Sequence, residues 1–318
     1  MNLHENKDTF RNAIRAASDH LGVRDEYIEK DYWVTFLLKR LSLSPHSKNV
    51  VFKGGTSLSK VHKLIARFSE DVDLAILKSE GQSETQIRNM IRSIEKEITK
   101  GFDEVVVEEI TSKKTNFRKS AYNYDRTINP DSPSGVQEKL ILEINSFANP
   151  VPYEMQSVNS MIAQFFLETG NEKSIESYNL DSFKLNVLVP QSTLIEKVLS
   201  LVRLSFFEDS TEKIKSKVRH FYDIYFLSKS PFCKDYLISK EFKIDFDRMF
   251  AEDKTKFEDP EEWLKAHYTD APIFKSFDEI WNKVKGNYET DFRLLVYGEF
   301  PGESQIAEQF RALLMSLE

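Results

Sequence analysis

The amino-acid sequence predicts an α+β fold, and three observations lead to this prediction. Residues 50–76 contain an apolar run, a glycine pair, a helix-like run and a second apolar run that begins with two aspartates. This order indicates a strand, a turn, a helix and a second strand. Apolar and polar residues alternate over 104–110 and 139–147, a spacing typical of strands. Helical spacing of apolar residues dominates after residue 190, so we expect the C-terminal part to be mainly helical.

The remaining elements follow from the same periodicities. We expect helices over 8–20, 23–41, 54–67, 83–100, 161–167, 193–204, 211–228, 260–263, 274–284 and 305–317. We expect strands over 50–52, 71–74, 104–110, part of 115–127, 139–147 and 183–189, and loops over 42–49, 129–135 and 245–259. Ser192 or Thr193 can cap the helix at 193, because Glu196 lies at capping-box spacing from Thr193.

Prolines 150 and 152 mark the expected domain boundary. We therefore expect a first domain over 1–150 and a mainly helical second domain over 151–318. The chain of 318 residues is long enough for two such domains, and its 40% hydrophobic content is enough for a substantial core.

Composition restricts the compartment and the partners. No run approaches the roughly 20 apolar residues of a membrane span, and the polar N-terminus lacks a secretory signal. Cys233 is the single cysteine, which excludes an internal disulfide and cysteine-based zinc sites. We expect a cytoplasmic protein that has no membrane partner. The net charge of −7 argues against general coating of nucleic acid.

The strand end at 71–74 carries the strongest chemical signal. Asp71 and Asp73 share one strand face, because successive side chains of a strand point to opposite sides. Two neighbouring carboxylates repel each other unless a cation lies between them, and Mg²⁺ is the usual cation. Gly54 and Gly55 allow a phosphate to approach the backbone at the start of a helix. Either motif alone is more often a solvated turn, but their order and combination favour a metal and phosphate site.

This combination, in the form FKGGTSLSK…RFSEDVDL, resembles the signature of the polymerase-β-like nucleotidyltransferases, and in particular the AbiEii/AbiGii toxin family of abortive-infection and toxin–antitoxin systems. The resemblance implies a nucleotidyltransferase core in which helices flank a mixed β-sheet, and a mainly helical C-terminal part that completes the cleft. It implies two Mg²⁺ ions held by Asp71 and Asp73, and an NTP as the substrate. The implied nucleotide-binding residues are Lys53, Gly54, Gly55, Thr56, Ser57 and Arg67. We add Ser69, because strand alternation places it on the face of Asp71 and Asp73 if the strand extends that far; a plain turn hydroxyl is the alternative.

Three further residues complete the expected catalytic set. Glu143 lies in the strand predicted over 139–147 and is the candidate third carboxylate, although it can instead pair with a basic residue of the adjacent strand. Lys197 lies in a TLIEK helix start that resembles a family motif, which implies a contact with nucleotide phosphates. Asp223 lies in a segment that resembles another family motif and is expected to pair with Arg219 or Lys197, either as part of the chemistry or as a buried ion pair. His220 stands where the family often has an acid.

The motif EKDYW at 29–33 also resembles the family's N-terminal motif. Lys30 and Asp31 can line the cleft, although a surface ion pair is the simpler interpretation. Three basic clusters are compatible with a polyanion along one face, although each alone is an ordinary solvated surface; they are Lys53/Lys60/Lys63/Arg67, Lys113/Lys114/Arg118/Lys119/Arg126 and Lys213/Lys215/Lys217/Arg219/His220.

The resemblance also implies the biology. We expect a toxin that transfers a nucleoside monophosphate to RNA, particularly the tRNA 3′ end, and a cognate antitoxin. The alternatives are modification of a protein or small molecule, or an inactive nucleotidyltransferase fold that serves as a binding module. The intact aspartate and glycine motifs argue against the last alternative.

Overall fold

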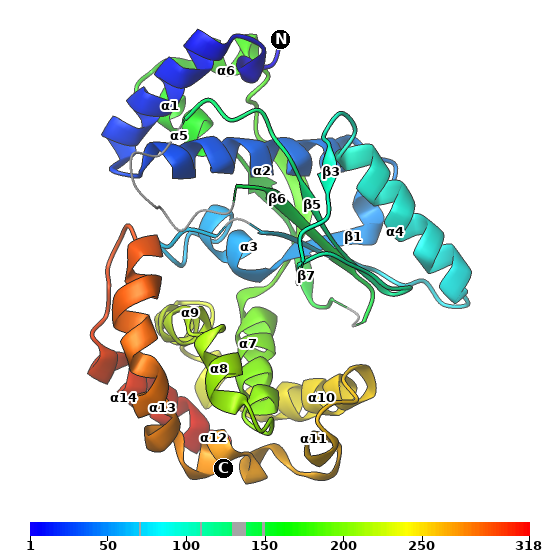
Figure 1. Ribbon diagram of the computed structural model, residues 1–318, viewed down its shortest axis with the longest axis vertical. Helices are drawn as coiled ribbons and strands as arrows, with labels where there is room; N and C mark the ends of the chain where they lie inside the picture. The colour runs from blue at the N-terminus through cyan, green and yellow to red at the C-terminus, as the bar shows by residue number, and fades with distance from the viewer. Residues whose placement is uncertain (70, 109, 129–137, 148–149) are drawn as a thin grey trace. The chain divides into compact units, whose positions relative to one another are not determined.

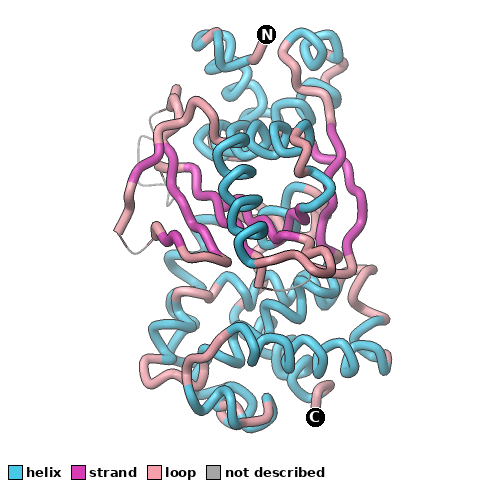
Figure 2. Tube along the Cα trace, turned by 90° about the vertical axis from the view of Figure 1, so that its right-hand side faces the viewer, coloured by secondary structure: helices cyan, strands magenta, loops and turns pink. Residues whose placement is uncertain are grey.

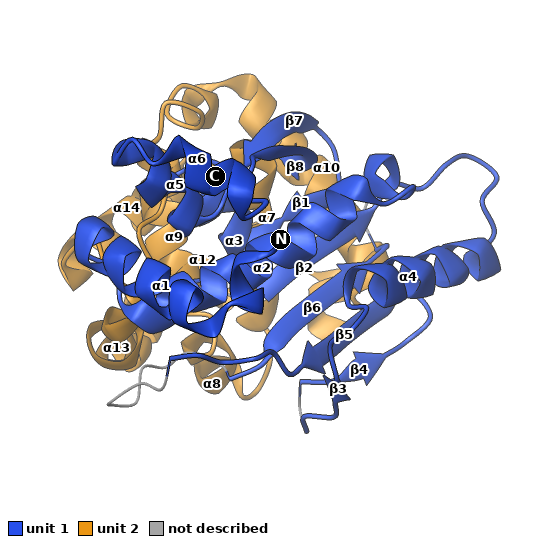
Figure 3. Cartoon of the chain, turned by 90° about the horizontal axis from the view of Figure 1, so that it is seen from above, with its two compact units in different colours: residues 1–63, 68–188 blue, residues 64–67, 189–318 orange. Residues whose placement is uncertain are grey.

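The computed structural model of the chain describes residues 1–69, 71–108, 110–128, 138–147 and 150–318. The loop expected over 129–135 lies outside the described residues. The chain forms two compact units (Figure 3). Unit 1 contains residues 1–63 and 68–188, and unit 2 contains residues 64–67 and 189–318.

Unit 1 is built on a mixed sheet of eight strands within the described residues, which confirms the expected α+β fold (Figure 1). Its order is β3-β5-β6-β2-β1-β8-β7, and β4 pairs with β5. The central strand β2 is antiparallel to β1 and parallel to β6, and β1 is parallel to β8. The strands are β1 (Val50–Lys53), β2 (Asp71–Ile76), β3 (Glu104–Val105), β4 (Ser112–Lys113), β5 (Phe117–Tyr122), β6 (Leu140–Asn145), β7 (Tyr153–Val158) and β8 (Phe183–Leu188).

Helices flank this sheet. The long helix α2 packs against β2, β6 and β8, and α4 packs against α2 and β6. α4 begins with a capping box, in which the Ser83 and Gln86 side chains each bond the other's backbone amide. The helices of unit 1 are α1 (Lys7–Leu21), α2 (Asp25–Leu43), α3 (Gly54–Lys60), α4 (Glu84–Ile98), α5 (Met161–Glu168) and α6 (Glu172–Ser177).

Unit 2 is helical in its described residues, as expected (Figure 2). Its core is rich in aromatic side chains. The Phe221 ring lies 5.1 Å from that of Trp281 and 4.9 Å from that of Phe310. The helices are α7 (Pro190–Leu204), α8 (Ser210–Lys215), α9 (Arg219–Lys229), α10 (Lys240–Lys256), α11 (Glu261–Lys265), α12 (Pro272–Lys275), α13 (Phe277–Asn287) and α14 (Glu303–Met315).

The division between the units lies at residue 188, whereas the sequence placed it at 150. The reason is the hairpin of β7 and β8. β7 pairs with β8, and β8 extends the sheet by pairing with β1. The sequence hides β7 because four of its six residues, YEMQSV, are exposed and the segment lacks the apolar alternation of a half-buried strand.

Several local expectations were wrong for physical reasons. The strand over 104–110 shrinks to two residues at an exposed sheet edge. The supposed loop over 245–259 is mostly α10, because Phe242, Phe246 and Phe250 form a buried stripe at four-residue spacing. The first helix after the glycine pair ends at Lys60 rather than Arg67.

Two further local expectations also differ from the structure. The helix expected over 211–228 is two helices, α8 and α9. The helix α7 has no side-chain cap: Val189 is its N-cap and Pro190 occupies the first turn, where a missing N–H costs nothing.

Candidate active site

The two aspartates of β2 lie as the alternation predicts. Asp71 and Asp73 are partly exposed, whereas Val72 and Leu74 are 1% and 0% exposed. β6 runs parallel to β2, and its Glu143 stands in register with Asp73. Side chains in register on neighbouring strands share a face, so three carboxylates gather on two adjacent strands. The structure therefore brings Glu143 to the place where the sequence expected a third carboxylate.

Lysines flank this acidic group on both outer strands. Lys53 of β1 is in register with Asp73, and Lys119 of β5 is in register with Glu143. The Lys119 ammonium lies 3.6 Å from a Glu143 carboxylate oxygen. The alternative for Glu143, pairing with a basic residue of the next strand, is thus also realised. We use the name acidic row for the carboxylates Asp71, Asp73 and Glu143 together with their flanking lysines, Lys53 and Lys119.

Lys119 was not among the expected site residues. The sequence placed it in a basic cluster and in a partly alternating segment, but no pattern there gives the register between strands. Its contact with Glu143 depends on the pairing of β5 with β6, which sequence periodicity does not define.

The neighbouring carboxylates change the pKa of Asp73, the central carboxyl of the row. Burial, followed by the charges of Glu143 and Asp71, raises the pKa of Asp73 to about 7, although Lys53 and Lys119 oppose this shift. A carboxyl in this range gains from any cation that binds beside it, because the cation offsets both the repulsion and the lost hydration. The acidic row therefore has the electrostatics of a cation site.

The glycine turn approaches the acidic row closely. Gly54 has φ +80°, and a Cβ atom at this position would lie 2.2 Å from Asp73 Oδ2. Only glycine fits both the backbone conformation and the space. Thr56 follows in α3 and donates a hydrogen bond of 2.6 Å to the carbonyl of Asp71. The turn and the acidic strand thus form one tightly packed unit.

Ser69 lies beside the same turn. Its hydroxyl is 3.0 Å from the Thr56 hydroxyl. β2 begins at Asp71, so the strand geometry that would place Ser69 on the face of the aspartates does not extend to it. Ser69 has the position of a turn hydroxyl at the edge of the site.

Replacement of Gly54 by alanine is expected to reduce activity by about a hundredfold, the typical effect of a displacement near 1 Å at a reacting group. Gly81→Ala is the matched control. Gly81 has φ +78°, so it carries the same backbone strain, but a Cβ atom there meets nothing within 4 Å. Steady-state kinetics and thermal unfolding of both variants separate the effect of backbone strain from the effect of the clash with Asp73. Equal losses in both would show that the approach to Asp73 is unimportant.

The raised pKa of Asp73 also predicts a pH dependence of stability in the metal-free protein. Between its ordinary pKa of 3.8 and about 7, the unfolded carboxyl releases its proton while the folded one keeps it. Stability contributed by this group therefore falls as the pH rises through that window. Asp73→Asn removes the effect, so the variant should gain up to about 4 kcal/mol at pH 8 and little at pH 4. Urea unfolding with a chelator present tests this. A variant that is less stable than wild type at pH 8 would contradict it.

The other expected site residues form a separate cluster inside unit 2. Asp223 of α9 is 0% exposed and Arg67 is 2% exposed. Arg67 donates two hydrogen bonds to the Asp223 carboxylate, from Nε to Oδ1 at 2.6 Å and from Nη2 to Oδ2 at 2.7 Å. The Lys197 ammonium lies 2.7 Å from Asp223 Oδ2. We call these three residues the buried triad.

The buried triad corrects one expectation and supports another. The second cation beside Asp223 is Arg67, not Arg219. The structure realises the buried ion pair that the sequence offered as one interpretation of Asp223. Burial alone would raise the pKa of Asp223, but Arg67 and Lys197 outweigh it and lower that pKa. Lys197 does not snorkel to the surface, since its side chain is 7% exposed.

His220 lies next to this triad. Burial and the charges of Lys197, Lys217 and Arg219 lower the pKa of His220 well below its ordinary value, so the imidazole is neutral. Its Nδ1 atom is buried and has no hydrogen-bond partner among the described residues. The family's acid at this place is therefore replaced by an uncharged group.

The EKD motif at the start of α2 is an internal anchor in unit 1. Glu29 and Lys30 are 1% and 0% exposed, so the interpretation as a surface ion pair is wrong. Each of the three charged groups bonds a different segment. The partners are the amides of Thr127 and Ile128 for Glu29, the carbonyl of Lys139 for Lys30, and Lys60 with the amide of Met161 for Asp31.

Most members of the three basic clusters form ion pairs with carboxylates of the same unit. Two of these ion pairs, Lys60–Asp31 and Arg67–Asp223, are buried. The ion pairs are Lys60–Asp31, Arg67–Asp223, Lys113–Glu104, Arg118–Glu95, Lys119–Glu143, Arg126–Glu138, Lys213–Asp209 and Lys215–Glu212. These pairs weaken the electrostatic case for a polyanion along one face.

The acidic row fits Mg²⁺ by the chemistry of its donors. Carboxylate oxygens are the ligands this ion prefers, and it is usually bound by one or two carboxylates together with waters and substrate phosphates. Within the part of the chain that the structure describes, no three histidine, cysteine or acidic side chains converge to hold a metal ion by themselves.

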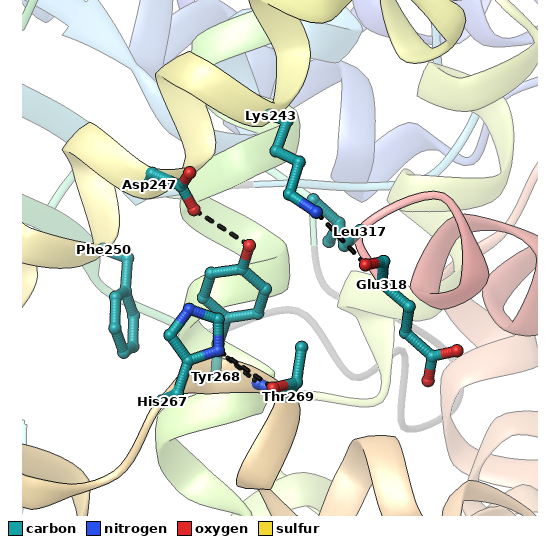
Figure 4. A pocket seen from close by; sticks show the side chains of 8 residues that line it. All are labelled: Lys243, Asp247, Phe250, His267, Tyr268, Thr269, Leu317 and Glu318. Carbon is teal, nitrogen blue, oxygen red and sulfur yellow. Dashed lines mark hydrogen bonds between the residues drawn. The ribbon is translucent and has the colours of Figure 1, made fainter.

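Unit 2 also contains an open pocket of about 530 Å³, which none of the expected site residues lines (Figure 4). In its wall, Tyr268 donates a hydrogen bond of 2.8 Å to Asp247. The ring of His267 lies 4.0 Å from that of Tyr268. The pocket lining includes two side-chain carboxylates, those of Asp247 and Glu318, and the ammonium of Lys243. This balance of charge does not favour a polyphosphate.

No described helix combines the length and the apolar character that crossing a membrane requires.

Three solved structures are among those similar to this chain. The crystal structure of JHP933 from Helicobacter pylori is 16% identical and has a TM-score of 0.46, covering 92% of each chain. A putative nucleotidyltransferase from H. pylori is 16% identical with a TM-score of 0.48, and 93% of this chain and 96% of that chain are covered. MenT4, a nucleotidyltransferase toxin from Mycobacterium tuberculosis H37Rv, is 14% identical with a TM-score of 0.36, covering 86% and 98%.

A search of curated proteins gives no match. The family profile described as "Nucleotidyl transferase AbiEii toxin, Type IV TA system" matches residues 36–315, which is most of the chain. This match confirms the resemblance that the glycine and aspartate motifs indicated. The chain belongs to the AbiEii nucleotidyltransferase toxin family.

Proposed function

We propose that this protein transfers a nucleoside monophosphate from an NTP to an RNA acceptor, tRNA in the first instance, as the toxin of a toxin–antitoxin pair. One observation supports the chemistry most directly. The acidic row sets Asp71, Asp73 and Glu143 on adjacent strands, and the Gly54 turn packs directly against Asp73. The choice of RNA rests on the resemblance to the toxin family, not on the geometry.

In the proposed reaction, Asp71 and Asp73 would hold Mg²⁺, with two ions taking part. Bound metal would neutralise charge on the triphosphate and favour ionisation of the acceptor hydroxyl. Gly54, Gly55, Thr56 and Ser57 at the start of α3 would contact the triphosphate, as the family resemblance implies. The acceptor oxygen bonds to the α-phosphorus, the bond to the bridging oxygen breaks, and pyrophosphate leaves with that electron pair.

A protein or small-molecule acceptor is the second candidate, and one observation favours it. Carboxylates pair with most members of the three basic clusters, including Lys113, Arg118, Arg126 and Lys213. These exposed or half-buried pairs leave less positive charge for a phosphate backbone, which dominates affinity for nucleic acid.

Incubation of the purified protein with each labelled NTP and Mg²⁺ tests the proposal. Parallel reactions contain total RNA, purified tRNA or an RNase-treated protein lysate. We expect the label to appear in RNA, and we expect nuclease treatment of the product to release it. Label in the lysate proteins alone would support the second candidate, and no label in any reaction would overturn the proposed transfer.

A further inference from the structure

A short segment of the chain passes into unit 2 between two parts of unit 1. Leu64–Arg67 packs with unit 2, although Lys63 before it and Phe68 after it belong to unit 1 (Figure 3). In the sequence this segment lies between α3, which begins with the glycine turn, and β2, which begins with Asp71. We call Leu64–Arg67 the strap.

The backbone of the strap is fixed within unit 2. Arg67 forms an isolated β-bridge with Val296. The carbonyl of Ala66 accepts hydrogen bonds from the amides of Tyr297 at 3.0 Å and Gly298 at 3.1 Å. A Cβ atom on Gly298 would lie 2.3 Å from the Cβ of Ala66, so a larger residue at 298 must displace the strap.

The side chain of Arg67 adds a second anchor. Its two hydrogen bonds to Asp223 have the fork geometry of a bidentate guanidinium–carboxylate pair, which fixes orientation as well as charge. Both groups are buried, so solvent does not weaken the pair. Asp223 is in turn fixed by Lys197 at 2.7 Å. The strap is therefore held from its backbone and from its terminal side chain.

The chain is also fixed where it returns to unit 1. The Phe68 ring stacks on that of Tyr27, with 4.1 Å between centroids and 10° between planes. The Ser69 hydroxyl lies beside that of Thr56, and Asp71 follows Arg67 by four positions.

We propose that the strap is a device by which unit 2 positions the strand of Asp71 and Asp73, and that Arg67 and Asp223 are positioning residues that act through it. This inference rests on the proposed nucleotidyl transfer for its kinetic consequences. The proposal explains why Arg67 and Asp223 are buried, which a contact with nucleotide does not require. It also means that the acidic row is well ordered only when unit 2 is folded.

Gly298→Ala tests the strap without touching an expected site residue. We expect transfer to fall at least tenfold, since small displacements of reacting groups have large effects, and the half-saturating Mg²⁺ concentration to rise. In the metal-free protein without NTP, hydrogen exchange in 71–76 should accelerate. Ala66→Gly removes the clashing atom, so the double variant Ala66→Gly/Gly298→Ala should recover all three properties. Gly286→Ala is the control, because a Cβ there meets nothing within 4 Å.

Arg67→Lys is the second variant, since it keeps the charge but loses the bidentate pair. It should show the same changes as Gly298→Ala. The strap is overturned if folded Gly298→Ala and Arg67→Lys lower only the melting temperature, or change nothing, while exchange in 71–76 stays at the wild-type rate. If wild-type protein transfers no nucleotide, the proposed function fails, and hydrogen exchange still decides the strap.

Discussion

Replacement of both Asp71 and Asp73 by asparagine is expected to abolish nucleotidyl transfer while the protein stays folded. The two carboxylates share a strand face and are the proposed metal ligands, whereas asparagine carries no charge to attract a divalent ion. Loss of charge stabilisation at a reacting phosphate is expected to reduce kcat on the order of a thousandfold or more. Initial rates with purified protein and labelled NTP measure the effect.

Thermal unfolding provides the control for this variant. Asparagine removes repulsion within the acidic row, so the metal-free variant should melt at or above the wild-type temperature. A folded double variant that retains transfer would refute the role of the two aspartates. A lower melting temperature would show instead that the carboxylates support the fold.

Replacement of Lys197 by methionine is expected to impair both stability and transfer. The ammonium is buried against Asp223, so its loss leaves Asp223 with Arg67 as its partner cation. Breaking a buried pair typically costs 3–5 kcal/mol, and the remaining Arg67 pair should limit the loss to about 1–3 kcal/mol. The contact between Lys197 and nucleotide phosphates stays a prediction from the family resemblance. If the contact exists, kcat/KM of the methionine variant should fall by more than its unfolded fraction explains.

Lys197→Arg distinguishes the two roles of this residue. Arginine keeps the charge beside Asp223, so most of the stability should remain, but its planar head differs in shape from an ammonium and would meet a phosphate in another geometry. We expect poor rescue of kcat/KM at a temperature where both variants are folded. If transfer follows the folded fraction in both variants, Lys197 has a structural role alone.

The acidic row shows which part of the site periodicity can predict. Strand alternation put Asp71 and Asp73 on one face, as the structure has them. The family resemblance, not the alternation, implied that Glu143 lies on a neighbouring strand, and β6 does pair with β2. Glycine at position 54 is explained by its close approach to Asp73. The shared face of the aspartates and the glycine turn are local features, because each follows from side-chain direction within a strand or from one turn.

The features that the sequence did not predict depend on contacts between distant segments. Arg67 pairs with Asp223 across 156 positions, whereas Arg219, four positions from Asp223, was the obvious candidate. The partner of Asp31 in the EKD motif is Lys60, which lies on another helix. Periodicity gives the face of an element but not what packs against it, so Arg67 and Lys60 were not predicted as the partners of Asp223 and Asp31.

The position of the label after transfer tests the reaction class most directly. Two reactions with the same NTP, one labelled on the α-phosphate and one on the γ-phosphate, are run with wild-type protein, Mg²⁺ and purified tRNA. Nucleotidyl transfer places the α-label on the RNA and releases the γ-label as pyrophosphate. The γ-label on the RNA, or release of free phosphate with unlabelled RNA, would contradict the proposed reaction.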